Sequence, residues 1–132
     1  MRYLGIDYGS KKTGIAFSDD AGTMGFPRGV IFTDKNLAER LSKLIDEEKV
    51  GAVVIGESKN FDGTDNPIAT EARTFARELR SRANVPIFFE TEIFTTQEAR
   101  RLPTGERVSG GVVDAAAAAL ILTSYLSKNG NN

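Results

Sequence analysis

The sequence predicts one α/β domain built on a mixed β-sheet with helices on both faces. Three apolar runs separated by short turns open the chain, and apolar runs then alternate with segments of helical period. Strands joined by short turns pair antiparallel, whereas strands separated by helices pair in parallel. The length of 132 residues and a composition of 40% hydrophobic and 27% charged residues fit an ordinary globular domain.

The opening meander consists of strands expected over residues 2–8, 13–18 and 29–33. The connection over 9–12 is Gly-Ser-Lys-Lys, short enough for an antiparallel hairpin. Pro27 stands just before the third expected strand, where its missing N–H does least harm.

The later elements follow from changes of period. Leu37, Leu41, Leu44 and Ile45 fit one face of a helix, which Thr33 or Asp34 can cap. The run VGAVVIG is continuously apolar, as in a strand covered on both faces. In chain order we expect a helix over 34–49, a strand over 50–56, a helix over 64–82 with Pro67 in its first turn, a strand over 85–90, a short helix over 95–102, a polar loop over 103–111 and a helix over 112–127. We expect a single domain over 1–128 and a frayed tail over 129–132.

The composition limits the chemistry that this chain can perform. It contains no cysteine and no histidine, which excludes disulfides, Cys or His metal ligands and Ser-His triads. Catalysis would have to use carboxylates, hydroxyls, Lys, Arg or an oxygen-bound metal. The net charge of −1 means that a nucleic-acid partner would need a local basic patch.

The start of the chain, MRYLGIDYG, has an Asp inside its first apolar run and does not resemble a signal peptide. No run approaches the roughly 18 apolar residues of a membrane span. We therefore expect a cytoplasmic protein without a membrane partner.

Three carboxylates stand where elements could converge. Asp7 interrupts the first strand, Glu92 follows the apolar run ending at Phe89, and Asp114 opens the alanine-rich last helix. Each has an ordinary structural explanation: a turn residue, a solvated strand end and a helix cap. Five consecutive alanines after Asp114, however, would let that helix lie close against the sheet. Glu57 is a spare candidate at the end of the central strand.

Converging carboxylates favour a bound cation, because like charges repel unless they are neutralised. Oxygen-only ligation suits Mg²⁺ or Mn²⁺, and such ions activate water for phosphodiester hydrolysis. The sequence thus predicts a metal-dependent nuclease with Asp7, Glu92 and Asp114 as both metal ligands and catalytic residues.

Basic side chains that could hold a phosphate backbone form two groups beside this site in sequence. They are Lys11 and Lys12 after the first strand, and Arg100, Arg101 and Arg107 before the last helix. A third stripe, Arg73, Arg77 and Arg80, is interleaved with Glu71 and Glu78 and is typical of a solvated helix face.

Four segments, in order, resemble the YqgF/RuvX family: LGIDYGSKKTGIAFSD, VVIGESKNFDGTDNP, ETEIFTTQEA and VVDAAAAALILTSYL. The resemblance implies a ribonuclease-H-like fold. It also implies a nuclease, described in this family either as a Holliday-junction resolvase or as an enzyme maturing the 5′ end of pre-16S rRNA in ribosome biogenesis. The family's acidic residues fall on Asp7, Glu92 and Asp114, and its partners would be pre-rRNA or branched DNA.

The chain departs from the family pattern beside these carboxylates. Where the family commonly has Asp-Glu-Arg, this chain has Thr91-Glu92-Ile93, so both flanking charges are missing. The usual Gly-x-Pro is Gly56-Glu57-Ser58, and Val112 replaces a common Lys. These changes leave open how far catalysis is impaired.

Two other functions remain open at this stage. One is a catalytically weak nucleic-acid-binding protein, because the supporting charges are thinned. The other is an ATP-binding phosphotransfer domain, because Asp7-x-Gly-x-Lys-Lys-x-Gly resembles the first phosphate loop of the actin and sugar-kinase superfamily. Such proteins need a duplicated domain, which ranks this alternative lower. The sequence leaves open whether the protein is a monomer or a homodimer, and whether it binds one metal ion or two.

Overall fold

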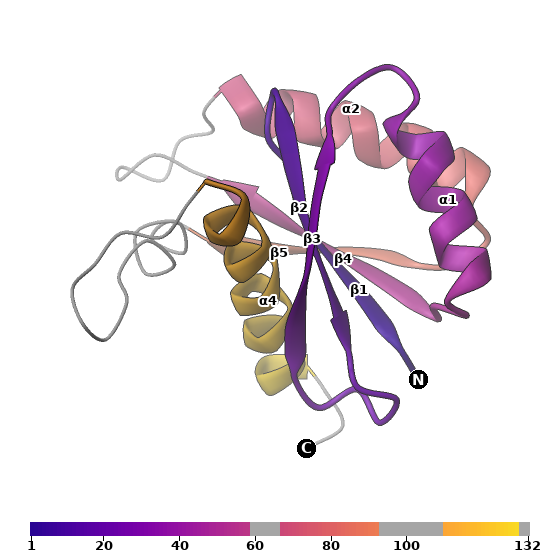
Figure 1. The fold of residues 1–132 in the computed structure, drawn as a ribbon. Coiled ribbons are helices and arrows are strands. Elements are labelled where there is room, and N and C mark those ends of the chain that lie inside the picture. The colour runs from indigo at the N-terminus through magenta and orange to yellow at the C-terminus, as the bar shows by residue number, and fades with distance from the viewer. Residues whose placement is uncertain (59–66, 93–109, 130–132) are drawn as a thin grey trace.

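The computed structural model describes residues 1–58, 67–92 and 110–129. It contains a five-stranded sheet with three helices packed on it (Figure 1). The elements in chain order are β1 (Tyr3–Asp7), β2 (Lys12–Ser18), β3 (Gly25–Phe32), α1 (Leu37–Glu47), β4 (Ala52–Ser58), α2 (Pro67–Arg82), β5 (Ile87–Glu92) and α4 (Gly110–Asn129).

The strand order in the sheet is β3-β2-β1-β4-β5. Strands β1, β2 and β3 pair antiparallel, and β1, β4 and β5 pair in parallel. The predicted class, an antiparallel meander followed by parallel strands, is therefore confirmed. Parallel pairing brings the carboxyl ends of β1, β4 and β5 to one edge of the sheet.

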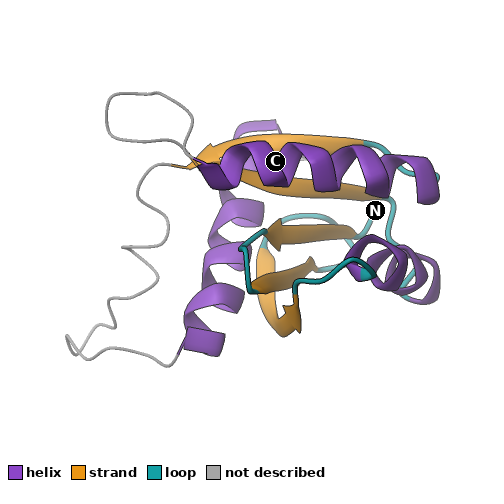
Figure 2. Cartoon of the chain, turned by 90° about the horizontal axis from the view of Figure 1, so that it is seen from above, coloured by secondary structure: helices purple, strands orange, loops and turns teal. Residues whose placement is uncertain are grey.

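Helices cover both faces of the sheet, as predicted. Helices α1 and α2 lie on one face and α4 lies on the other (Figure 1), and the view from above shows strands between α4 and α1 (Figure 2). The α1/α2 face holds large side chains, among them Leu4, Ile6, Leu41, Ile55 and Leu79. The α4 face holds smaller ones, including Ala16, Ala52, Val54, Ala118 and Ala119.

Strand β3 differs from its prediction because it begins at Gly25, four residues earlier than expected, and includes Pro27. β3 is an edge strand, the position in a sheet where proline is tolerated because one side of the strand makes no ladder hydrogen bonds. The register also shifts between Ile15 and Ala16, which pair with Gly29 and Pro27, so Arg28 is the extra residue of a bulge. Edge position and bulge together explain why proline did not end this strand.

The predicted capping of the first helix was wrong. Asn36 is the N-cap of α1, and no side chain makes a capping hydrogen bond. Asp34 instead accepts a hydrogen bond from the Asn36 N–H at 2.9 Å, and the Thr33 hydroxyl donates to the Gly9 carbonyl at 2.7 Å. The helix stops before Lys49, whose φ of 55° is left-handed.

Other boundaries shift by small amounts. Strands β4 and β5 end two residues later than predicted, so Glu92 is the last residue of β5 rather than a residue beyond it. Helix α4 begins at Gly110 and ends at Asn129, and so includes two glycines expected in the loop and the first residue of the expected tail. The predicted helix over 95–102, most of the expected loop and residues 130–132 lie outside the described residues.

Across the described ranges, no helix combines the length and the apolar character that crossing a membrane would need.

Candidate metal and nucleic-acid site

Asp7 ends β1 on the face of the sheet that α4 covers. Alternate strand residues share a face, and Tyr3 packs with the α4 core while a Cβ on Gly5 would meet Ala118 and Leu122. Asp7 follows in the same alternation and is half-buried. Its backbone pairs with Gly14 on β2.

The turn after Asp7 is held in one shape by three hydrogen bonds. Thr33 donates from its hydroxyl to the Gly9 carbonyl at 2.7 Å and from its N–H to the Lys11 carbonyl at 2.9 Å. The hydroxyls of Thr33 and the fully buried Thr13 lie 2.7 Å apart. A Cβ on Gly9 would lie 2.3 Å from the Lys12 carbonyl oxygen, so only glycine fits here. This braced turn carries Lys11 and Lys12, both exposed, beside Asp7.

The backbone register places Glu92 at the same edge of the sheet as Asp7. Ile6 pairs with Ile55, so Asp7 is level with Gly56, which in turn pairs with Glu90. Glu92 stands two residues farther along β5 and pairs with Ser58. Two strand spacings of about 4.8 Å separate β1 from β5.

Glu90 is a buried carboxylate that the sequence interpretation did not single out. Its side chain is 6% exposed, and its Oε2 accepts hydrogen bonds from the Ser124 hydroxyl at 2.7 Å and the Lys128 ammonium at 2.6 Å. These bonds join β5 to the last turns of α4. Burial, and then the neighbouring Tyr3 and Glu90, raise the pKa of Tyr125 above its ordinary value. No local sequence signal marks a partner that lies 38 residues away.

Asp114 does not open its helix, as the sequence interpretation assumed. It is the fifth residue of α4, and the first turn holds no acidic residue. The ordinary explanation of Asp114 as an N-terminal cap is therefore wrong.

The alanine-rich helix does approach the sheet closely, as predicted. A Cβ on Gly5 would lie 2.9 Å from the Ala118 carbonyl oxygen, and a Cβ on Gly25 would lie 2.9 Å from that of Ala119. The close approach depends on glycines of the strands as well as on alanines of the helix, and the sequence interpretation identified only the alanines.

Glu57, the spare carboxylate, belongs to the other face of the sheet. It shares strand alternation with Val53 and Ile55, which pack in the core beneath α1 and α2. Its Oε2 lies 3.7 Å from the Nε of Arg73 on α2. Glu57 is thus on the wrong face to join Asp7.

The other two arginines of that stripe are exposed, as expected of a solvated helix face. Arg77 hydrogen-bonds the Thr74 hydroxyl at 3.4 Å, and Arg80 the Ile87 carbonyl at 3.3 Å. Arg100, Arg101 and Arg107 lie outside the described residues, as do the side chains of Glu92 and Asp114. Among the side chains that are described, no three acidic groups gather to hold a metal.

The fold is similar to that of two solved Holliday junction resolvases. Thermus thermophilus RuvC, solved with a Holliday junction substrate, superposes with a TM-score of 0.60 at 17% identity, covering 98% of this chain and 96% of that one. The fowlpox virus Holliday junction resolvase superposes with a TM-score of 0.57 at 13% identity, covering 97% of this chain and 99% of that one. At these identities the likeness shows the fold alone.

Sequence comparison is more specific. The chain belongs to the RuvX family, whose model, described as Holliday junction resolvase, matches residues 1–128. A protein of Nitratidesulfovibrio vulgaris is 39% identical over 134 residues, covering 96% of this chain and 94% of its own. One of Carboxydothermus hydrogenoformans is 36% identical over 138 residues, covering 100% of both chains. Both relatives carry the name "Putative pre-16S rRNA nuclease".

Proposed function

We propose that this protein is a divalent-metal-dependent nuclease that hydrolyses phosphodiester bonds in structured RNA, with Asp7, Glu92 and Asp114 as its catalytic carboxylates. The family and the names of its relatives support the nuclease class, and the names of the relatives support the choice of pre-16S rRNA as substrate. The proposed unit of activity is the single domain over residues 1–128, working in the cytoplasm.

The alignment of α4 against β1 carries this proposal. The ring of Tyr3 lies 6.4 Å from that of Tyr125, and two residues along β1 the position of Gly5 faces Ala118 and Leu122. Two strand residues span about 6.6 Å, close to the 6 Å of four helical residues. Continued by one step, this match would bring Asp7 level with the turn that contains Asp114, which supports pairing the two carboxylates.

The donor chemistry fits a hard cation. Asp7 is half-buried at a braced strand end, and carboxylate oxygens are the ligands that Mg²⁺ and Mn²⁺ prefer. Asp7, Glu92 and Asp114 would hold the ion. When bound, it would lower the pKa of a water molecule and stabilise charge on the phosphate.

The chain's own cations would position the substrate. Lys11 and Lys12 are exposed on the braced turn beside Asp7, where ammonium groups would bind phosphates on either side of the scissile bond. Arg100, Arg101 and Arg107 are proposed to extend this contact. Their part of the chain precedes α4 and therefore Asp114.

The second candidate substrate is a four-way DNA junction. The family description favours it, because that description is of a Holliday junction resolvase. The same carboxylates would serve either substrate, since both reactions hydrolyse a phosphodiester.

A cleavage panel tests the proposal. Labelled pre-16S 5′-end RNA, a four-way DNA junction and an unstructured RNA would be incubated with wild-type protein, Asp7→Asn and Asp46→Asn over a Mg²⁺ series. Asp46 is an exposed residue of α1 and serves as the matched control. We expect Mg²⁺-dependent cleavage of the structured RNA by wild type and Asp46→Asn, and none by Asp7→Asn. Cleavage by Asp7→Asn at the wild-type rate would contradict the assignment of Asp7 to the catalytic site. Cleavage of the DNA junction alone would contradict the assignment of structured RNA as the substrate.

A further inference from the structure

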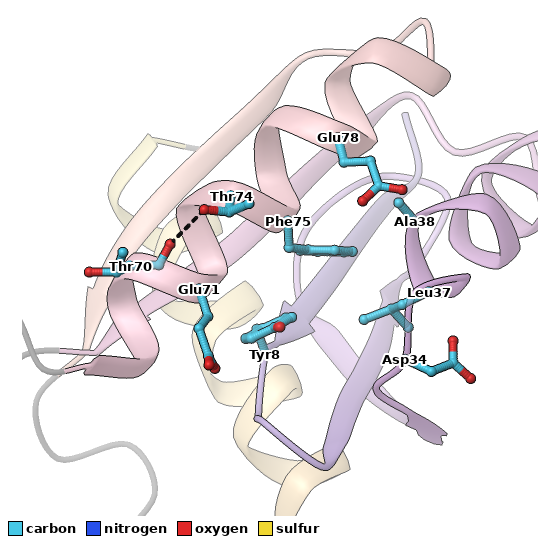
Figure 3. A pocket seen from close by; sticks show the side chains of 9 residues that line it. All are labelled: Tyr8, Asp34, Leu37, Ala38, Thr70, Glu71, Thr74, Phe75 and Glu78. Atoms are coloured by element: carbon cyan, nitrogen blue, oxygen red, sulfur yellow. Dashed lines mark hydrogen bonds between the residues drawn. The ribbon is translucent and has the colours of Figure 1, made fainter.

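A pocket opens on the face of the sheet opposite the proposed nuclease site. It lies between the end of β1, helix α1 and helix α2, with a cavity volume of about 280 Å³ (Figure 3). Tyr8 lines it and directly follows Asp7 in the chain, so the two residues face opposite sides of β1. The proposed nuclease chemistry makes no use of this pocket.

One wall of the pocket is apolar. The rings of Tyr8 and Phe75 stack with centroids 5.2 Å apart and an interplanar angle of 29°. Leu37 and Ala38 of α1 face this pair across the cavity (Figure 3). Such a wall suits an alkyl chain or the flat face of a planar group.

Carboxylates surround that wall, and among the described residues that line it none is basic. Asp34, Glu71 and Glu78 all line the cavity. The Asp34 carboxylate is paired with Arg40 at 2.9 Å, and that of Glu78 with Arg82 at 3.4 Å.

Glu71 differs from the other two carboxylates in having no counter-ion among the described residues. Within the described part of the chain, no cation lies within ion-pair distance of it. With Asp34 and Glu78 paired, Glu71 gives the described lining of the pocket one negative charge that no described cation offsets.

We propose that this pocket binds an arginine side chain of a protein partner. The guanidinium would pair with Glu71 and lie against the Tyr8 ring, while its methylene stem would pack on Leu37. A nucleic acid would bring phosphates to a rim of carboxylates, so it is disfavoured here. The rim is open, with Asp34, Thr74 and Glu78 exposed, which leaves room for the backbone from which such a side chain projects.

Backbone-amide NMR with three probes tests this proposal. The first probe is an acetyl-Gly-Arg-Gly-amide peptide. The second is the same peptide with citrulline, which keeps the shape of arginine and removes its charge. The third is guanosine, which reports whether the pocket takes a nucleobase instead. Glu71→Gln removes the unpaired charge, and Glu39→Gln, exposed on α1 and outside the pocket, is the matched control.

We expect saturable shifts from the arginine peptide at Tyr8, Ala38 and Thr74, and weaker binding of the citrulline peptide by about tenfold or more. Glu71→Gln should weaken binding of the arginine peptide by a similar factor, and Glu39→Gln should leave that binding unchanged. Three results would overturn the proposal: equal affinity for both peptides, an unchanged affinity of Glu71→Gln for the arginine peptide, or chemical-shift changes confined to residues outside the pocket. Guanosine binding that depends on Glu71 would also overturn it, in favour of a nucleobase.

Discussion

The two faces of the sheet are packed in different ways. Beneath α1 and α2, large aliphatic side chains such as Leu4, Ile6 and Ile55 are fully buried and form a core of ordinary kind. On the α4 face, Gly5 and Gly25 meet the backbone of the helix directly. The first face derives its stability from apolar volume, whereas the second brings backbone close to backbone.

The difference concerns function as well as packing. A helix that rests on glycines and alanines has little freedom to shift, because main-chain atoms rather than flexible side chains set its distance from the sheet. Asp7 lies on this face and Asp114 on this helix. The close-packed face therefore suits a site whose charged groups must keep fixed positions, while the aliphatic face supports the fold.

The largest expected effect is on the close-packed face. Gly5→Ala places a Cβ 2.9 Å from both the Ala118 carbonyl oxygen and the Leu122 Cβ, and neither can move without shifting α4. We expect a loss of about 2 kcal/mol in the free energy of unfolding. Ile6→Val, the next residue on the aliphatic face, should cost about 1 kcal/mol. Urea denaturation measures both, and a smaller cost for Gly5→Ala than for Ile6→Val would contradict the contrast between the faces.

The carboxylate that joins β5 to α4 should have a smaller effect. Glu90→Gln keeps the shape of the side chain but removes the charge that accepts from Ser124 and Lys128. Lys128 is 61% exposed, so solvent screens that pair, and we expect a loss of only about 1 kcal/mol. Glu47→Gln, exposed on α1, is the control. Thermal melting of both variants measures this loss. Equal melting temperatures for Glu90→Gln and Glu47→Gln would show that the hydrogen bonds of Glu90 do not stabilise the α4 face.

The sequence predicted the elements better than the contacts between them. The period of Leu37, Leu41 and Ile45 identified α1, because periodicity is a local property. The predicted N-cap was wrong, because the Thr33 hydroxyl hydrogen-bonds instead to the carbonyl of Gly9, 24 residues away. Pro27 was interpreted as a strand boundary. The edge position and the bulge that accommodate it depend on pairing with β2, which the local sequence does not reveal.

The site shows the same limit. Asp7 could be singled out because an acid inside an apolar strand is a local anomaly. Glu90 was missed because its partners lie on the last helix, and Glu57 could be set aside only once its face and its contact with Arg73 were known. The sequence indicated acidic residues, but the pairing register was needed to separate the two faces.

The smallest expected effect concerns a carboxylate far from both cores. Asp19, in the turn after β2 at the opposite end of the sheet from Asp7, accepts hydrogen bonds from the N–H and the hydroxyl of Thr23. These bonds hold the pKa of Asp19 below its usual value. A depressed pKa contributes stability that is present above the unfolded value of about 3.9 and is lost as the pH falls through the folded value.

Asp19→Asn should therefore have a slightly lower melting temperature than wild type at neutral pH. On acidification below about pH 4, its melting temperature should fall less than that of wild type. Melting curves between neutral and strongly acidic pH measure this difference. Identical pH profiles for the two proteins would rule out the stabilising role of this turn.

The central claim, that Asp114 acts with Asp7 at a metal site on the close-packed face, is tested by Asp114→Asn. Asp and Asn have similar helix propensities, so this change inside α4 should leave the fold intact. We expect a fall in cleavage rate of about 100-fold or more at saturating Mg²⁺. We also expect the loss of the rise in melting temperature that Mg²⁺ gives wild type, while Asp19→Asn keeps both responses. An Asp114→Asn protein that cleaves at the wild-type rate and is still stabilised by Mg²⁺ would contradict the account.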